Sequence, residues 1–308
     1  MLAGPAASVA CQDGIAHHRL AGATVQERAR EVLAAGPRAL LLGTSVQAVV
    51  ERALAVQARA GTPPIPTLAV LDAMLFVERR FGPDLAELAD RVACPDPETA
   101  LRLEQAGAPP SRLIVTGNPT LEEIGLTASS PPPELSPDRP TDILFVSSPV
   151  EAMRRRGTEF AIDERQTLDD VLAALDALRS LSPAGYRVRV RWHPIQRPVT
   201  LPATPPGIVI ESDDEPDRLR SCAEARVVVG LSSTLLGEAR LLPRAAVAYL
   251  PGPYWDRERV FAPSYGVRLA RTPDDVRTML ADALSRPPDP APLAGHLGAT
   301  AHIADLFE

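Results

Sequence analysis

The chain has 308 residues, of which 45% are hydrophobic and only 4% aromatic, and its formal net charge is −7. This length accommodates about two domains of ordinary size with cores of aliphatic side chains. All 32 basic residues are arginine, which excludes Schiff-base enzymes and P-loop NTPases because both need a lysine, and the negative net charge argues against nucleic-acid binding.

Targeting and metal signals are weak in this sequence. No apolar run approaches the roughly 18 residues of a membrane span, and no signal peptide is visible, so we expect a cytoplasmic protein. The three cysteines, Cys11, Cys94 and Cys222, are far apart in the chain. Their spacing indicates neither a disulfide framework nor a zinc site.

Strand and helix signals alternate along the first half, which is typical of β-α-β units with mostly parallel sheets. The predicted strands are Arg38–Ser45, Pro66–Ala73, Arg91–Asp96 and Leu113–Asn118. The predicted helices are Val25–Ala35, Val46–Ala60, Pro97–Ala106 and a short acidic one at Leu121–Ile124.

A proline-rich segment, Thr127–Thr141, separates the two halves and is predicted to be a linker. The strands predicted after it are Asp142–Ser147, Arg187–Trp192, Ile208–Glu211, Arg226–Leu231, Ala246–Leu250 and Val267–Ala270. The helices predicted after it are Glu164–Arg179, Asp217–Ala225, Thr234–Leu242, Pro273–Ser285 and Leu293–Phe307. The sequence therefore predicts an N-terminal lobe over 1–126 and a C-terminal lobe, with the terminal helix, over 142–308.

Ligands of open parallel sheets bind outside the carboxyl ends of the strands, so the residues after each strand are the candidates for a site. Ser232, Ser233 and Thr234 follow a buried strand and start an amphipathic helix. Hydroxyls and free N–H groups at a helix N-terminus can bind phosphate without lysine. Glu238, one turn later, can reach the ribose of the same nucleotide. The alternative is that a serine caps the helix and Glu238 is solvated.

Two further strand ends carry groups suited to catalysis. His193 closes a strand and is followed by a proline, with Arg197 nearby, so either side chain could contact a phosphate or a leaving group. Asp72 follows an apolar strand, where a general base could be placed. A structural histidine and a turn or capping aspartate are the respective alternatives.

Two strand ends of the first half are candidates for acceptor or phosphate contacts. One is Thr116–Pro119, where Gly117 allows close backbone approach beside Asn118, and the other is Gly43, Thr44 and Ser45. Each could equally be a turn or a helix cap. The acidic run Ser212–Asp217 looks like a metal-binding DxD motif, but its place before a helix favours capping, so no metal is expected.

Three short motifs in this order resemble the GT-B superfamily of glycosyltransferases and nucleotide-sugar epimerases. They are VTGNP at the end of the first half, HP after a strand of the second half, and SSTLLGEA before the final strands. Within that superfamily the chain looks most like bacterial transferases of capsular or cell-envelope polysaccharides with HP and SS motifs. The resemblance spans roughly residues 38–306. It implies an α/β fold of two doubly wound, Rossmann-like lobes that face a cleft.

The resemblance also implies roles for the candidates. The C-terminal lobe would hold the nucleotide, with His193, Ser232 and Ser233 on phosphate and Glu238 on ribose, and the N-terminal lobe would hold the acceptor, with Asp72 as the base. Two features depart from the superfamily. Leu231, Ser232 and Ser233 stand where related 2-epimerases usually have SGG. We also expect the first β-α unit of the N-terminal lobe to be missing, either because the start codon is misplaced or because that part of the lobe has been lost. The shortened lobe predicts a homo-oligomer or a partner protein at its exposed sheet edge.

From these features we expect a metal-independent glycosyltransferase that moves a sugar from a nucleotide-sugar donor to a hydroxyl acceptor without a cofactor. The alternatives are a nucleotide-sugar 2-epimerase or hydrolase on the same fold and a non-catalytic paralogue that binds a nucleotide sugar and works with a partner protein.

Overall fold

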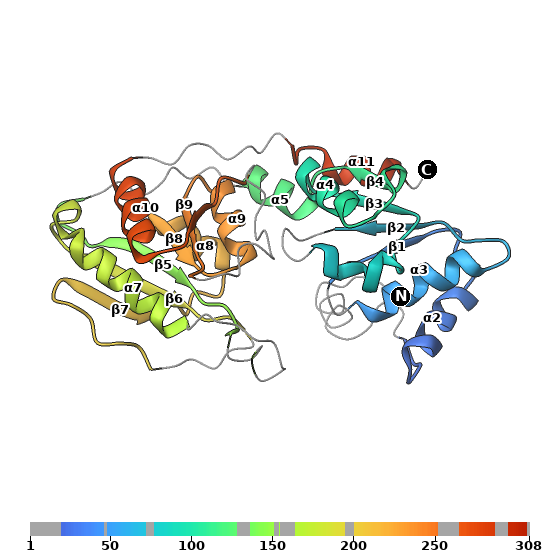
Figure 1. The fold of residues 1–308 in the computed structure, drawn as a ribbon, viewed down its shortest axis with the longest axis horizontal. Coiled ribbons are helices and arrows are strands. Elements are labelled where there is room, and N and C mark those ends of the chain that lie inside the picture. Colours follow the sequence, from blue (N-terminus) through green and yellow to red (C-terminus); the bar gives the residue numbers. More distant parts are fainter. Residues whose placement is uncertain are drawn as a thin grey trace. The chain divides into compact units, whose positions relative to one another are not determined.

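The computed structural model describes residues 20–45, 48–71, 77–127, 136–150, 154, 164–194, 200–251, 265–286 and 295–306. The chain forms two compact units (Figure 1). Unit 1 contains the chain up to Pro119 and the segment from His296 onward, and unit 2 runs from Thr120 to Gly295. Each unit is built around its own parallel sheet.

Unit 1 contains a four-stranded sheet whose order, β1-β2-β3-β4, is the order of its strands in the chain. Its strands are β1 (Leu40–Leu42), β2 (Thr67–Val70), β3 (Arg91–Cys94) and β4 (Leu113–Val115). Its helices are α2 (Val25–Ala34), α3 (Val49–Ala60), α4 (Pro97–Gln105), α11 (Ala299–Asp305) and the short 3-10 turns η1 (Val77–Phe81), η2 (Pro83–Leu85) and η3 (Pro110–Arg112).

Local sequence signals fix where the helices of unit 1 begin. Thr24 and Glu27 form a capping box, in which the Thr24 hydroxyl accepts from the Glu27 N–H while the Glu27 carboxylate accepts from the Thr24 N–H. Asp96 caps α4, and Pro97 occupies the first helical position, where its missing N–H costs nothing. The strand-turn-helix transitions of the sequence thus appear at their predicted places.

Unit 2 contains a six-stranded sheet in the order β10-β9-β8-β5-β6-β7. Its strands are β5 (Thr141–Val146), β6 (Tyr186–Arg191), β7 (Ile208–Ser212), β8 (Val227–Gly230), β9 (Ala245–Tyr249) and β10 (Arg268–Ala270). Its helices are α5 (Pro119–Thr127), α7 (Glu164–Ala177), α8 (Arg218–Glu224), α9 (Thr234–Leu241), α10 (Pro273–Ser285) and the 3-10 turn η4 (Arg179–Leu181). Strand β5, which comes first in the sequence of unit 2, lies inside the sheet, with β6 on one side and β8 on the other.

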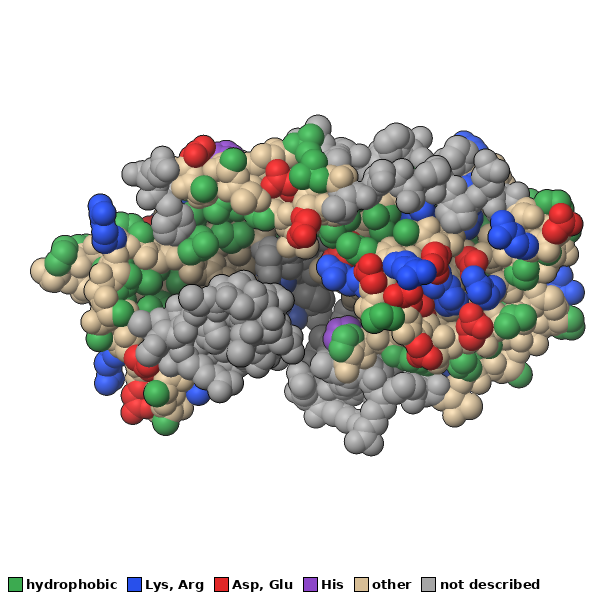
Figure 2. Space-filling view, turned by 180° about the vertical axis from the view of Figure 1, so that it is seen from behind, with side chains coloured by type: hydrophobic (Ala, Val, Ile, Leu, Met, Phe, Trp, Pro, Cys, Tyr) green, Lys and Arg blue, Asp and Glu red, His purple; other side chains and the backbone are tan. Residues whose placement is uncertain are grey.

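Strand β6 places arginines on one face at every second position, where they meet carboxylates. Arg189 and Arg191 both reach Asp213, at 3.1 and 2.8 Å, and Arg187 pairs with Asp142. The Asp213 side chain is 2% exposed, so its charge is compensated within the fold, as a buried carboxylate requires. Acidic and basic side chains interleave over the face of unit 2 seen on the right of Figure 2.

The unit boundaries differ from the predicted lobes at both ends. The helix predicted at Leu121–Ile124 lies in α5, which belongs to unit 2 from Thr120 onward rather than to the first lobe. The terminal helix α11 belongs to unit 1, because Ile303 packs against Leu68 and Ala93 of its sheet. A proline-rich segment without hydrophobic periodicity predicts a linker, but it does not show which sheet the helices on either side of it will cover.

Parts of the predicted plan lie outside the described residues. These are the start of the N-terminal lobe over 1–19, the linker core over 128–135, and the candidate residues Asp72 and Arg197. Among the described helices, none combines the length and the apolar character that crossing a bilayer demands.

Candidate nucleotide site and the two sheet edges

Three neighbouring strands of unit 2 end at the same level. Val146 of β5 pairs with Arg191 of β6 on one side and with Gly230 of β8 on the other. The residues that follow these strands therefore meet at one edge of the sheet. The His193 N–H donates to the Ser147 hydroxyl at 3.4 Å, which connects the end of β6 to the end of β5.

Ser148 connects the ends of β5 and β8. Its hydroxyl accepts from the Ser232 N–H at 3.3 Å and donates to the Ser232 carbonyl oxygen at 3.3 Å. The Ser148 N–H donates to the Glu164 carboxylate at 2.7 Å. This backbone N–H is therefore already hydrogen-bonded within the protein. Ser147 and Ser148 are both buried. These hydrogen bonds hold the segment after β5 against the segment after β8, so the two segments form a defined surface at the strand ends.

This edge coincides with the point where the strand order reverses. β5 is followed in the chain by β6 on one side, and β8 then lies on the other side of β5. The crevice outside such a reversal is where open α/β sheets bind ligands. Glycine allows the close approach there, since a Cβ added to Gly230 would lie 2.3 Å from the Val146 carbonyl oxygen.

Helix α9 begins directly after this edge. Ser233 is its N-cap, and the Ser233 hydroxyl accepts from the Leu235 N–H at 3.3 Å. The capping interpretation of Ser233 is therefore correct, while no hydrogen bond among the described residues takes up the Ser232 hydroxyl. The positive end of the α9 dipole is directed at the strand ends, and Thr234 starts the helix.

Glu238 is not the solvated residue of the alternative interpretation. Its side chain is 10% exposed, and one carboxylate oxygen accepts from Arg218 Nε at 2.9 Å. This hydrogen bond raises the pKa of Arg218. The pair connects α8 to α9 beside the phosphate-binding candidates.

His193 is half-buried, and burial lowers its pKa below the usual value. A neutral imidazole therefore predominates near neutral pH, where it can donate or accept one hydrogen bond without carrying charge. A histidine at this place can hold a polar ligand group or pass a proton.

The acidic run 212–217 serves the fold. Asp213 accepts from Arg189, Arg191 and the Ser221 hydroxyl, and Asp217 caps α8, as the sequence predicted for the run. Within the described residues no group of three or more His, Cys, Asp and Glu side chains is arranged to hold a metal ion.

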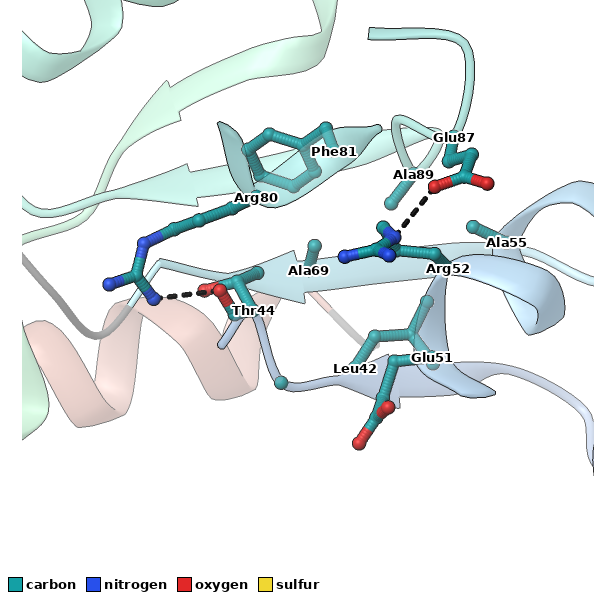
Figure 3. A pocket seen from close by; sticks show the side chains of 11 residues that line it. Leu42, Thr44, Glu51, Arg52, Ala55, Ala69, Arg80, Phe81, Glu87 and Ala89 are labelled. Atoms are coloured by element: carbon teal, nitrogen blue, oxygen red, sulfur yellow. Dashed lines mark hydrogen bonds and ion pairs between the residues drawn. The ribbon is translucent and has the colours of Figure 1, made fainter. Parts of the chain in front are cut away.

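At the corresponding edge of unit 1, described side chains bond to the backbone. Thr44 is buried, with its hydroxyl donating to the Val70 carbonyl oxygen at 2.9 Å, and Arg80 donates to the Thr44 carbonyl oxygen at 2.7 Å. These residues line a small pocket together with Gly43, while Arg52 pairs with Glu87 at 2.6 Å on its other side (Figure 3). Ser45 is exposed next to them.

The last strand of unit 1 ends in a tight turn. Gly117 has a positive φ of 84°, a conformation that glycine adopts without strain. Asn118 is buried directly behind it, and the Thr116 hydroxyl donates to the Gly117 carbonyl oxygen at 3.0 Å. The glycine is thus required by the turn, whatever else it contacts.

Solved structures of similar fold align with nearly the whole chain. A putative UDP-N-acetylglucosamine 2-epimerase from Listeria monocytogenes aligns with a TM-score of 0.63 at 14% identity, covering 99% of this chain and 87% of that one. The UDP-GlcNAc 2-epimerase from Neisseria meningitidis bound to UDP-GlcNAc gives 0.56 at 13%, covering 98% and 88%. The glycosyltransferase of kitacinnamycin gives 0.56 at 15%, covering 99% and 89%. No family model and no curated protein sequence matches.

The chain has the GT-B fold. The two parallel sheets of units 1 and 2 are the two Rossmann-like sheets of that fold, as the sequence predicted. At 11–15% identity the similarity establishes the architecture and leaves the chemistry to the residues.

Within the GT-B fold, the structure groups the candidates in two sets. His193, Ser232, Ser233, Thr234 and Glu238 belong to one edge of unit 2, and Gly43, Thr44, Ser45, Gly117 and Asn118 belong to unit 1.

Ser147, Ser148 and Arg218 were not among the residues predicted from the sequence. The serine pair after β5 could have been found from the rule that already selected Ser232, because both pairs follow apolar strands. Arg218 left no such signal, since its pairing with Glu238 joins two helices that are twenty residues apart in the chain.

Proposed function

We propose that this protein binds the diphosphate of a nucleotide sugar at the carboxyl edge of β5, β6 and β8 and acts on that sugar as an enzyme. The observation that carries the proposal is the Ser148–Ser232 connection at the reversal of strand order, immediately before the N-terminus of α9. The position where open α/β sheets bind ligands, the serine hydroxyls and the positive end of a helix dipole all lie at this edge.

The edge suits the charge of a diphosphate without a lysine. Backbone N–H groups at the start of α9, the Ser232 hydroxyl and the neutral His193 imidazole can each provide a hydrogen bond. Donors that are fixed before the reaction stabilise a departing phosphate as its charge grows. We therefore assign His193, Ser232, Ser233 and Thr234 to phosphate, Arg197 to the same group, and Glu238 to ribose.

The first candidate reaction is epimerisation at C2 of the bound sugar, or hydrolysis of the nucleotide sugar. It is supported by the solved structures with this architecture, most of those reported being UDP-GlcNAc 2-epimerases, one of which holds UDP-GlcNAc. Asp72, which follows β2, is the proposed base.

The second candidate is glycosyl transfer to a hydroxyl acceptor. A glycosyltransferase of similar architecture supports it. The Ser232-Ser233 pair also supports it, because it departs from the SGG pattern that the resemblance to 2-epimerases implies. In this case Asp72 deprotonates the acceptor, and the acceptor contacts are assigned to Gly43–Ser45, Gly117 and Asn118 of unit 1.

Product analysis separates these candidates. The full-length protein is incubated with UDP-GlcNAc, with and without EDTA, and the mixture is resolved by anion-exchange chromatography and proton NMR. Appearance of the 2-epimer identifies an epimerase, UDP with free sugar identifies a hydrolase, and UDP only in the presence of added sugar acceptors identifies a transferase. Activity should survive EDTA.

The Asp72→Asn variant is assayed beside the wild type, with Asp305→Asn, an exposed aspartate of α11, as a control. Loss of a general base slows turnover by about 10²–10⁴-fold and spares nucleotide binding. If neither UDP nor UDP-GlcNAc binds at millimolar concentration, and other nucleotide sugars fail equally, the proposed function is wrong.

A further inference from the structure

Glu238 is a buried carboxylate on helix α9, whose other residues are apolar except for Thr234 and Arg240. Every residue from Leu235 to Leu241 is buried, and the Glu238 side chain keeps 10% of its exposure. A charge in such a place is costly unless it is paired and hydrogen-bonded. The partner is Arg218, whose Nε donates to one Glu238 oxygen at 2.9 Å.

Arg218 is held in position by the helix that carries it. It is the first residue of α8, directly after the N-cap Asp217, whose carboxylate accepts from the Leu219 N–H at 2.9 Å. One turn on, the Ser221 hydroxyl donates to the buried Asp213 at 2.7 Å. These bonds fix the start of α8 and the backbone of Arg218, whose side chain is 49% exposed and is oriented by its pairing with Glu238.

The pairing uses only part of the Glu238 carboxylate. Arg218 Nε contacts Oε2, and among the described residues no hydrogen bond reaches Oε1. Glu238 lies four residues after Thr234, so the two side chains are on the same face of α9. The Glu238 side chain therefore lies on the face of α9 whose first residue, Thr234, follows the strand ends.

We infer that Arg218 is a positioning residue that holds the Glu238 carboxylate oriented for a ribose hydroxyl, so that the pair selects ribonucleotides over deoxyribonucleotides. This inference rests on the proposed nucleotide site. Without the guanidinium, the buried carboxylate loses the hydrogen bond that fixes its orientation and can turn away, so the hydroxyl loses its acceptor. Arg218 itself need not touch the nucleotide.

Helix α8 provides a matched control. Arg220 is two residues further on, its side chain is 66% exposed, and it pairs with Glu224 and Glu215 rather than with α9. Replacing Arg220 by glutamine removes the same charge from the same helix and leaves Glu238 in place.

The experiment measures discrimination against missing hydroxyls. Calorimetry gives the affinity of the full chain for UDP, GDP, CDP and ADP, and the tightest of these is compared with its 2′-deoxy and 3′-deoxy forms. The proteins are the wild type, Arg218→Gln, Glu238→Gln, the double variant and Arg220→Gln. Thermal unfolding of each variant shows that it is folded.

We expect the wild type to bind the ribonucleotide at least about tenfold more tightly than one of its deoxy forms, the size of one lost charge-assisted hydrogen bond. Arg218→Gln and Glu238→Gln should each reduce that ratio to less than about threefold. The double variant should show no further loss, because the two residues act as one unit. Arg220→Gln should keep the wild-type ratio.

The outcomes separate the inference from the function on which it rests. If nucleotides bind the wild type but Arg218→Gln keeps the full ratio, or the wild type shows no preference, the inference fails and the phosphate site stands. If no nucleoside diphosphate binds the wild type, both fail. A lower unfolding temperature with an unchanged ratio marks a purely structural ion pair and also overturns the inference.

Discussion

The carboxyl edges of the two sheets carry similar residues but differ in how those residues are used. At the edge of unit 1, the Thr44 hydroxyl and the Arg80 guanidinium donate to backbone carbonyl oxygens and line a small pocket. At the edge of unit 2, Ser148 and Ser232 connect two strand ends beside the start of a helix and leave the Ser232 hydroxyl available.

The difference follows from topology. The described strands of unit 1 follow one another across the sheet in chain order, whereas unit 2 reverses direction at β5. Where successive connections leave a strand on opposite sides, the loops diverge and a ligand can enter. Composition alone does not distinguish the two edges, because hydroxyls and glycines occur at both.

The sharpest test of this comparison is a pair of glycines. A Cβ on Gly230 would lie 2.3 Å from a backbone oxygen, while a Cβ on Gly43 would meet nothing within 4 Å. Gly230→Ala should therefore destabilise the protein by about 1–3 kcal/mol, and Gly43→Ala should change stability by less than about 0.5 kcal/mol. Scanning calorimetry measures both. Equal effects would show that the close contact at Gly230 does not matter.

The second test concerns the histidine of the unit 2 edge. His193→Ala should weaken nucleoside diphosphate binding by about tenfold, because one hydrogen bond to a charged group is lost. The control is His302→Ala, an exposed histidine of α11 in unit 1. Calorimetric titration with UDP decides the matter, and indistinguishable affinities of the two variants would remove His193 from the site.

Removing one hydroxyl from each edge gives the third test. Ser148→Ala breaks the connection between β5 and β8 and should reduce nucleotide affinity severalfold. Thr44→Val removes a buried hydrogen bond and should cost about 1 kcal/mol of stability without changing affinity. A loss of affinity in Thr44→Val would mean that the edge of unit 1 contributes to nucleotide binding.

The smallest expected effect is a pH dependence shared by both units. Burial lowers the pKa of His193 in unit 2 and of His296 in unit 1, where Asp96 opposes it. For a histidine whose folded pKa is lowered, the stability is fully present above its unfolded pKa of about 6.5 and is lost as pH falls below it. Unfolding temperatures between pH 7.5 and 5 should fall, and less so in His296→Asn. An unchanged profile in that variant would assign the effect elsewhere.

The sequence predicted the strands and helices of both units closely because each has a strong local signal. The apolar run before Gly230 and the threonine-proline start of α10 need no distant partner to be recognised. Contacts between residues that are far apart in the sequence could not be predicted in the same way. That Ile303 packs on the first sheet, and that Arg218 pairs with Glu238, depends on which surfaces remain uncovered after the sheets form.

Only part of the site could be predicted, because only some of its features have a local signal in the sequence. A residue such as Ser232 or His193 is found by its place after a strand, which periodicity reveals. What His193 and Ser232 bond to depends on which strands are neighbours, and the sequence does not contain the strand order in any local pattern.

The return of α11 to unit 1 has a consequence for biosynthesis. Unit 1 lacks the helix that covers Leu68 and Ala93 until α11, which follows the whole of unit 2 in the sequence, has been made. At usual translation rates the whole of unit 2 takes roughly 10 to 35 seconds to emerge. During that interval the first sheet is present on the ribosome with part of its apolar face uncovered. The nascent chain is therefore most exposed to aggregation, and most in need of a chaperone, before its final helix appears.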